Sequence, residues 1–131
     1  MNKETVVKQR RKEIKDIAKH LLIGKVLSHP RVPFEMHIKV SGIKEWLNQP
    51  HIHYNEKNEA LLTLPELLRN AEYVSKVQDP KRRDYIVASH LFKTEICGSD
   101  SWIIVNETIW NECIVHSVSD NIPIKQEKQD F

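Results

Sequence analysis

Apolar residues recur at intervals of three and four positions over residues 3–24, and lysine and arginine fill most of the positions between them. This spacing is typical of an amphipathic α-helix. Helices commonly end at a glycine, and Gly24 follows the pattern. The sequence therefore predicts a basic helix as the first element. Its apolar stripe should pack on the rest of the domain or on a second copy of the chain.

Shorter elements are predicted next. Residues 34–40 alternate between apolar and polar types as a strand does, and Ser41 would cap a helix that runs through Leu47 and ends before Pro50. A second helix is predicted over about residues 55–62. The sequence Thr63-Leu64-Pro65-Glu66 has the form of a capping box, so a third helix should run to about residue 70.

The pattern becomes extended after Ala71. Four strands are predicted, over residues 72–77, 86–96, 102–105 and 114–119, with a polar loop over residues 78–84. Helices followed by an antiparallel meander predict an α+β fold with a four-stranded antiparallel sheet. We expect three parts: a basic helix (1–25), an α+β body (26–120) and a loose polar tail (121–131).

Composition narrows the class of protein. A chain of 131 residues suits one domain, and it has no signal peptide and no apolar run long enough to cross a bilayer. Cys97 and Cys113 are interpreted as two buried free thiols of a cytoplasmic protein, because two cysteines make no disulfide framework and their spacing is not that of a zinc site. No cofactor, metal or membrane partner is expected.

Charge is distributed unevenly along the chain. Residues 1–25 carry eight Lys or Arg against three acids, a balance of +5, and the remainder carries 12 against 15, a balance of −3. A basic end suits a polyanion such as RNA. A solvated helix face would have the same composition, and both interpretations stay open.

Side chains suited to proton transfer and phosphate binding are densest over residues 37–58. This stretch of 22 residues holds three His, three Lys, a Ser and a Tyr. Metal-free RNA cleavage needs a base for the 2′-hydroxyl proton, an acid for the leaving 5′-oxygen and donors for the phosphorus oxygens. The stretch supplies these types, and His116 or Ser117 could complete the set. It has no phosphate-binding glycine loop, and the pair His51 and His53 lacks further metal ligands.

Several motifs carry a resemblance to a known group. They are Val40–His51, Tyr54-x-x-Lys57-Asn58, Leu64–Tyr73, Trp102–Val105 and His116-Ser117-x-Ser119. Together they resemble the phage and mobile-element nuclease domains of the barnase–EndoU–colicin–RelE-like group, over roughly residues 36–120. The order of predicted elements agrees with that group.

The resemblance implies a metal-independent endoribonuclease-like domain that cleaves RNA by 2′-hydroxyl attack. Such domains are often toxins or effectors, often modules of a larger phage-type polypeptide, and an immunity or antitoxin protein would be a partner. The implied catalytic residues are His51, Lys57, Ser41, Ser117 and His53, and the implied substrate-binding residues are Lys39, Lys44 and Tyr54. The chain departs from barnase in having no obvious pair of glutamate base and histidine acid.

Each candidate also has a purely structural interpretation. Ser41 could serve as a helix cap alone, and Lys39 could be a solvated edge lysine. Ser117 is predicted to share a strand face with Val115 and Ser119, and it could be a surface-facing serine of the sheet. Lys57 falls in the first turns of a predicted helix, where the helix dipole makes a positive charge unfavourable, and this argues weakly for a function. Trp46 and Trp102 are expected in the core, and Trp110, in a turn, is the better base-stacking candidate.

A second hypothesis is a non-catalytic module that binds nucleic acid or protein on the same fold. Its 3–24 helix would be the contact for RNA, for a partner or for a homodimer.

Overall fold

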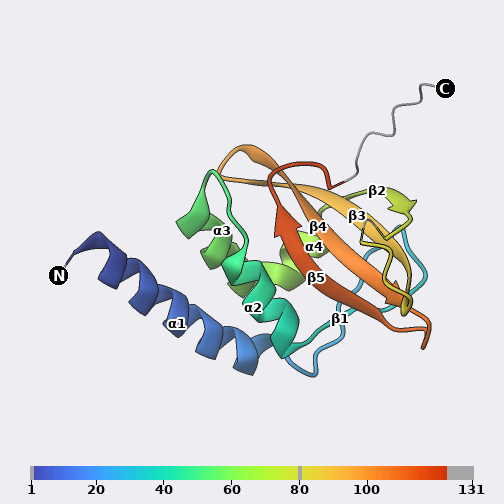
Figure 1. Ribbon diagram of the computed structural model, residues 1–131, viewed down its shortest axis with the longest axis horizontal. Coiled ribbons are helices and arrows are strands. Elements are labelled where there is room, and N and C mark those ends of the chain that lie inside the picture. The colour runs from blue at the N-terminus through green and yellow to red at the C-terminus, as the bar shows by residue number, and fades with distance from the viewer. Residues whose placement is uncertain (1, 80, 124–131) are drawn as a thin grey trace.

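The protein folds as a sheet with helices packed against one face (Figure 1). The computed structural model describes residues 2–79 and 81–123. The helices are α1 (Lys3–Leu22), α2 (Val40–Asn48), α3 (Tyr54–Ala60) and α4 (Leu64–Arg69), with a 3₁₀ turn, η1 (Leu61–Thr63), between the last two. The strands are β1 (His37–Ile38), β2 (Glu72–Val77), β3 (Ile86–Ile96), β4 (Ser99–Thr108) and β5 (Cys113–Ser119). The predicted α+β class is confirmed.

The sheet has five strands in the order β1-β5-β4-β3-β2, so the predicted four-stranded antiparallel sheet was wrong in detail. The four predicted strands are present and antiparallel, but β1 pairs with β5 in parallel, His37 beside Ile114. The strand predicted over residues 34–40 is reduced to two residues, because Val40 already begins α2. Two residues are too few to produce a recognisable alternation.

The core lies between the helices and one face of the sheet. Ile14, Ala18 and Leu22 of α1 are buried there, as the predicted apolar stripe requires. The first turns of α1 extend beyond the body of the protein (Figure 1). Gly24 follows α1 with a φ of 82°, a left-handed conformation that suits glycine.

Two predicted caps are corrected. The N-cap of α2 is Lys39, and Ser41 lies exposed inside the first turn. Thr63 does occupy the N-cap of α4, but its side chain makes no capping bond. Its hydroxyl donates instead to the carbonyl oxygen of Ala60, 3.2 Å away. The preceding turn therefore takes the hydroxyl that a capping box would use.

An irregularity in β5 decides which side chains face the core. The register between β4 and β5 shifts between Ile104 and Val105, which pair with Ser117 and Val115. His116 is therefore the extra residue of a β-bulge. As a result Val115 and Val118 both lie in the core, whereas Ser117 does not share the face of Val115 as predicted.

The remaining side-chain predictions have mixed outcomes. Trp46 is buried and Trp110 is 65% exposed, as expected, but Trp102 is only half-buried and lies outside the core cluster. Cys113 is buried and Cys97 is exposed, because Cys97 lies in the turn between β3 and β4 with a φ of 53°.

No helix among the described residues is long and apolar enough to cross a membrane. The predicted tail lies outside the described residues from position 124 onward.

Candidate functional site

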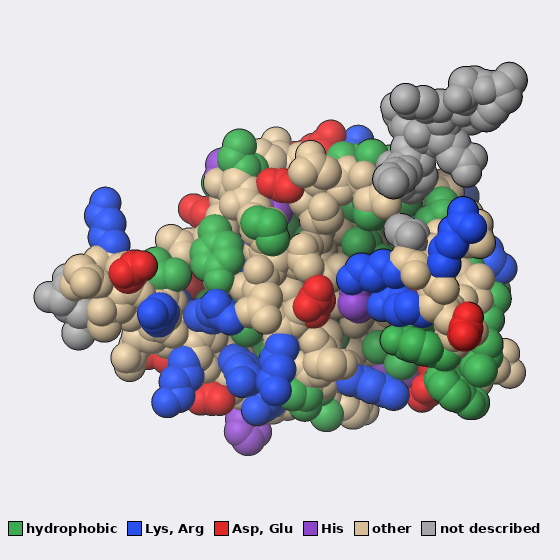
Figure 2. All heavy atoms as spheres, in the orientation of Figure 1, with side chains coloured by type: hydrophobic (Ala, Val, Ile, Leu, Met, Phe, Trp, Pro, Cys, Tyr) green, Lys and Arg blue, Asp and Glu red, His purple; other side chains and the backbone are tan. Residues whose placement is uncertain are grey.

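A pocket lies on the face of the sheet that points away from the core. Two adjoining depressions of about 260 and 310 Å³ share four lining residues, Glu45, Arg83, Asn106 and His116. We call this the open-face pocket. Along β4, the residues that line the pocket alternate with residues that face the core. Asn106, for example, lines the pocket, and the preceding residue, Val105, is buried in the core. Figure 2 shows basic side chains gathered beside a histidine on this face.

The loop between β2 and β3 places a cation in the pocket. Asp79, buried at 2% exposure, accepts backbone N–H bonds from Lys81 and Arg83 at 3.1 and 2.8 Å. The same carboxylate accepts two bonds from the Arg83 guanidinium, at 2.9 Å from Nε and 3.0 Å from Nη2. These bonds to Arg83 lower the pKa of Asp79 to about 2. The fixed Asp79 therefore holds the Arg83 guanidinium in one orientation at the pocket.

His116 is the titratable base of the open-face pocket. Burial lowers the pKa of His116 below its usual 6.5, and the positive charge of Arg83 lowers it further. Glu45, on α2, acts in the opposite direction. Among the described residues, no hydrogen bond is made by the His116 ring. A half-buried neutral imidazole with an unused nitrogen lone pair is suited to accept a proton at neutral pH.

Polar groups on the strands complete the floor. The Ser89 hydroxyl donates to Asn106 Oδ1 at 2.9 Å, so the amide nitrogen of Asn106 is the group left to donate into the pocket. Ser117 and Ser119 of β5 also line it. The floor thus offers neutral donors beside the cation of Arg83.

Predicted candidates Lys39 and Ser41 lie at the rim of the open-face pocket, where α2 begins. Lys39 Nζ is 3.6 Å from a carboxylate oxygen of Glu112, and both side chains are about half exposed. Such an exposed pair is weak, so Lys39 can exchange Glu112 for another anion. Lys44, also predicted, is exposed on α2.

An exposed aromatic patch borders the same pocket. The ring centroids of Tyr85 and Trp110 are 6.4 Å apart, and Tyr85 also lines the pocket. Val87 and Ile109 beside them are 49% and 55% exposed. Figure 2 shows hydrophobic side chains gathered at this end of the sheet. We call these four residues the aromatic patch.

The two predicted histidines lie elsewhere, at the connection between α2 and α3. His51 Nε2 is 2.8 Å from Ser101 Oγ, and His51 Nδ1 accepts the backbone N–H of His53 at 2.8 Å. His53 Nε2 is 3.0 Å from Ser99 Oγ. Burial is the main cause that lowers the pKa of His51. Nε2 of His51 thus fastens this connection to β4, and its Nδ1 is used in a bond within the connection.

Lys57 and Tyr54 stabilise the end of α2. The Lys57 side chain is fully buried, and its Nζ donates to the carbonyl oxygens of Trp46 and Leu47 at 2.7 and 3.2 Å. Trp46 Nε1 returns a bond to the Lys57 carbonyl at 2.8 Å, and the Tyr54 hydroxyl donates to the Leu47 carbonyl at 2.9 Å. Burial lowers the pKa of Lys57 to about 7. The lysine caps the last carbonyls of a helix inside the core.

The structure therefore divides the predicted residues into two groups. Lys39, Ser41 and Ser117 line the open-face pocket, whereas the four candidates His51, His53, Tyr54 and Lys57 bond to other parts of the fold. The eighth candidate, Lys44, is exposed on α2 and belongs to neither group. Sequence reasoning did not select Glu45, Arg83, Asn106 or Ser89. The basic run Lys81-Arg82-Arg83 in a polar loop was the one local signal available for any of them.

Comparison with models of protein families gives a match over most of the chain. The family described as "Large polyvalent protein-associated domain 3" matches residues 5–115. No curated protein and no solved structure matches the chain.

Proposed function

The chain belongs to the Large polyvalent protein-associated domain 3 family, and we propose that it is an endoribonuclease-like domain whose site is the open-face pocket. One observation carries the proposal. The His116 imidazole, which makes no hydrogen bond to the residues that the structure describes, lies in one pocket with the guanidinium of Arg83 and the carboxylate of Glu45. Attack of an RNA 2′-hydroxyl on the neighbouring phosphate needs a base for the hydroxyl proton and a fixed cation for the phosphate. A negative charge close to the base stabilises its protonated form.

In the proposed reaction His116 accepts the proton of the 2′-hydroxyl, and the 2′-oxygen bonds to phosphorus. The bond from phosphorus to the 5′-oxygen breaks, and the imidazolium of His116 gives its proton to that oxygen. The products are a 2′,3′-cyclic phosphate and a free 5′-hydroxyl. Glu45 stabilises the imidazolium between the two transfers, because its charge favours protonated His116.

The phosphate would be held by the pocket's donors. Arg83 is kept in place by Asp79, and its guanidinium can offer N–H donors to the negative charge that grows on the phosphorus oxygens. The Asn106 amide nitrogen and the exposed Lys81 lie on the same lining. Donors that are fixed before the substrate arrives stabilise the transition state most strongly.

The aromatic patch favours single-stranded RNA as the substrate. An unpaired base can stack on Trp110 or Tyr85 while the neighbouring phosphate enters the pocket. In a duplex the bases are paired and stacked on one another, so they cannot stack on an exposed aromatic side chain. The proposal therefore includes a preference for loops or unpaired segments.

The chemistry proposed for the pocket needs no metal ion. Two-metal phosphoryl transfer needs several carboxylates. In the open-face pocket, as far as the structure describes it, Asp79 is already bonded to Arg83, which leaves Glu45. The donor set of the pocket suits acid–base catalysis better than metal binding.

The test is an incubation of the protein with tRNA, total RNA and DNA of matched sequence, in EDTA. We expect fragments from RNA alone, ending in 2′,3′-cyclic phosphate, because DNA lacks the nucleophile. The variant His116→Ala should give no fragments. Binding of RNA without cleavage would instead favour the alternative of a non-catalytic nucleic-acid-binding module.

The family's description fits a role within a larger assembly. A domain associated with large polyvalent proteins suits the proposal that this one acts as a module of a larger, phage-type polypeptide. A toxin or effector role, and an inhibitor protein as partner, belong to the same proposal. Poor expression of the unaltered chain, relieved by His116→Ala, would support them.

A further inference from the structure

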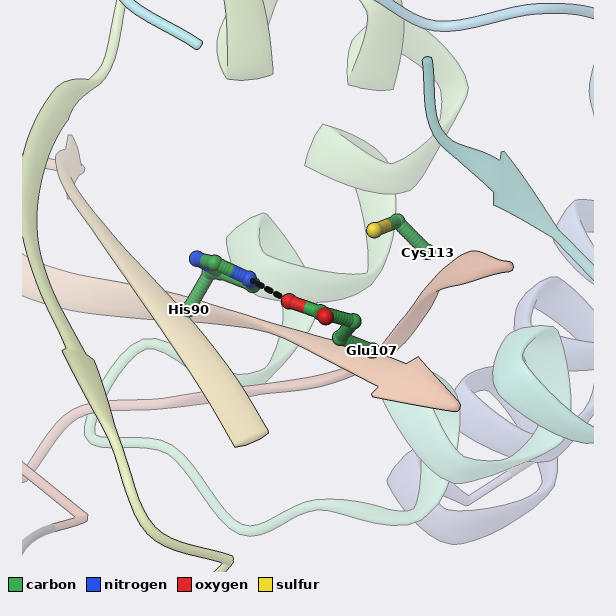
Figure 3. Close-up of side chains that lie close together, drawn as sticks. All are labelled: His90, Glu107 and Cys113. Carbon is green, nitrogen blue, oxygen red and sulfur yellow. Dashed lines mark hydrogen bonds and ion pairs between the residues drawn. The ribbon is translucent and has the colours of Figure 1, made fainter. Parts of the chain in front are cut away.

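We propose that His90, Glu107 and Cys113 form a zinc site on the core face of the sheet, separate from the open-face pocket. One residue comes from each of β3, β4 and β5, and Figure 3 shows the three side chains projecting on the same side of these strands. Their ligand atoms all lie within 4.8 Å of one another. The inference does not depend on the proposed RNA cleavage.

The spacing is close to that of a bound metal ion. Zinc–sulfur and zinc–nitrogen bonds of about 2.3 and 2.0 Å place tetrahedral ligand atoms about 3.5 Å apart. His90 Nε2 and Glu107 Oε1 are 2.9 Å apart in a hydrogen bond, which a bound zinc ion would replace. Side-chain rotations that move the ligand atoms of Glu107 and Cys113 by roughly an ångström would bring the three ligands to this spacing. Because Glu107 pairs with Cys113 across adjacent strands, the backbone already holds both residues in register.

A second residue is placed to orient the histidine. Tyr73 Oη lies 2.9 Å from His90 Nδ1, the nitrogen that would not bind the metal. Metal-bound histidines commonly use their other ring nitrogen in such a bond, which fixes the tautomer and the ring plane. Phe34 packs on the same imidazole, with ring centroids 4.6 Å apart.

The zinc ion and its ligands carry no net charge. One Zn²⁺ with a thiolate and a carboxylate sums to zero, and the exposed Lys76, whose Nζ lies 3.9 Å from Glu107 Oε1, adds one positive charge on the solvent side. His90 and Cys113 are 3% and 6% exposed, and the Glu107 side chain is 26% exposed, which leaves a route from solvent. The set of imidazole, thiolate and carboxylate is one that zinc prefers.

Binding requires two proton movements. Without metal, the Glu107 carboxylate 2.9 Å from Nε2 can only accept, so in a neutral His90 ring the Nε2 proton donates to Glu107 and Nδ1 accepts from the Tyr73 hydroxyl. With zinc, the lone pair of Nε2 bonds to the metal, the ring proton moves to Nδ1, and Nδ1 then donates to Tyr73. The Cys113 thiol loses its proton to solvent.

The test uses cobalt as a spectroscopic probe and zinc as a stabiliser. The whole chain is freed of metal with EDTA, dialysed and titrated with Co²⁺. We expect a thiolate-to-cobalt charge-transfer band that is lost in Cys113→Ser and kept in Cys97→Ser, the matched exposed cysteine. Free Zn²⁺ at about 100-fold above its Kd should raise the Tm of the unaltered chain by about 10 °C.

The variants keep the test decisive if one of them is poorly folded. Cys113→Ser changes one atom, and circular dichroism without metal shows whether it folds. His90→Ala, which removes a buried hydrogen-bonded group, serves only as a second variant. Absence of the band and of any Tm shift in the folded, unaltered chain would overturn the proposal. A band that survives in folded Cys113→Ser would also overturn it.

Discussion

A Cβ atom at Gly42 would lie 2.5 Å from the carbonyl oxygen of Val115. Helix α2 therefore approaches strand β5 more closely than any residue with a side chain permits. This contact places Glu45, one turn further along α2, in the same pocket as His116, the residue after Val115. The proposed site depends on this close approach.

We expect Gly42→Ala to destabilise the protein by about 2 kcal/mol, although alanine is the better helix former by about 1 kcal/mol. The added methyl group must displace backbone, and the displacement should also weaken any activity of the pocket. Urea unfolding measures the change. Ser41→Ala, at the exposed neighbouring position, is the control and should change stability by less than about 0.5 kcal/mol. Equal effects of the two variants would refute the packing argument.

The cleavage rate should depend on pH through His116. The proposed base must be neutral, and its pKa is lowered below 6.5, so kcat/KM should rise with pH and level off with a midpoint below 6.5. Glu45→Gln removes the charge that favours the imidazolium, so it should move this midpoint to lower pH. A midpoint that stays unchanged in Glu45→Gln would contradict the proposed electrostatic role.

Stability should rise with pH through Lys57. Its pKa is about 7 in the folded chain against 10.5 for the free side chain, so between these values the unfolded chain binds more protons. The free energy of unfolding should therefore increase between pH 7 and 8.5, by at most about 1.4 kcal/mol per pH unit. Urea unfolding of Lys57→Met should lose this slope, and Lys44→Met, an exposed control, should keep it. The prediction fails if Lys57→Met retains the slope.

Removal of the exposed indole should weaken RNA binding. Base stacking on an aromatic side chain contributes about 1–3 kcal/mol, so Trp110→Ala should raise the Kd for a single-stranded RNA about tenfold. Fluorescence anisotropy with a labelled strand measures it. Ile52→Ala, at an apolar position that is 73% exposed but outside the aromatic patch, should leave the Kd unchanged. Equal weakening by both variants would show that the patch has no special role.

Local patterns were enough to predict most of the fold. The 3.6-residue period of α1, the alternation in β2 and the long extended run of β3 each cover six residues or more, so they were recognised. The two-residue strand β1 and the bulge at His116 were not predicted, because each depends on pairing with a distant segment. Register is a tertiary property, and a one-residue shift reverses the facing of every later side chain.

The candidate site was harder to predict for a related reason. The density of functional side chains over residues 37–58 directed attention to His51 and Lys57. In the fold, His51 bonds to Ser101, and Lys57 bonds to two backbone carbonyls. The open-face pocket instead combines residues of a helix, a loop and three strands. Sequence proximity does not indicate which of these meet.

The central claim is that cleavage depends on His116 and not on His51. The most direct measurement compares single-turnover cleavage of a tRNA in EDTA by the unaltered chain, His116→Ala and His51→Ala, each shown to be folded. We predict that His116→Ala lowers the rate constant by at least about 100-fold, as expected for loss of a general base. His51→Ala should retain most of the rate. The account would be contradicted if His51→Ala lost the activity and His116→Ala kept it, or if the unaltered chain left the RNA intact.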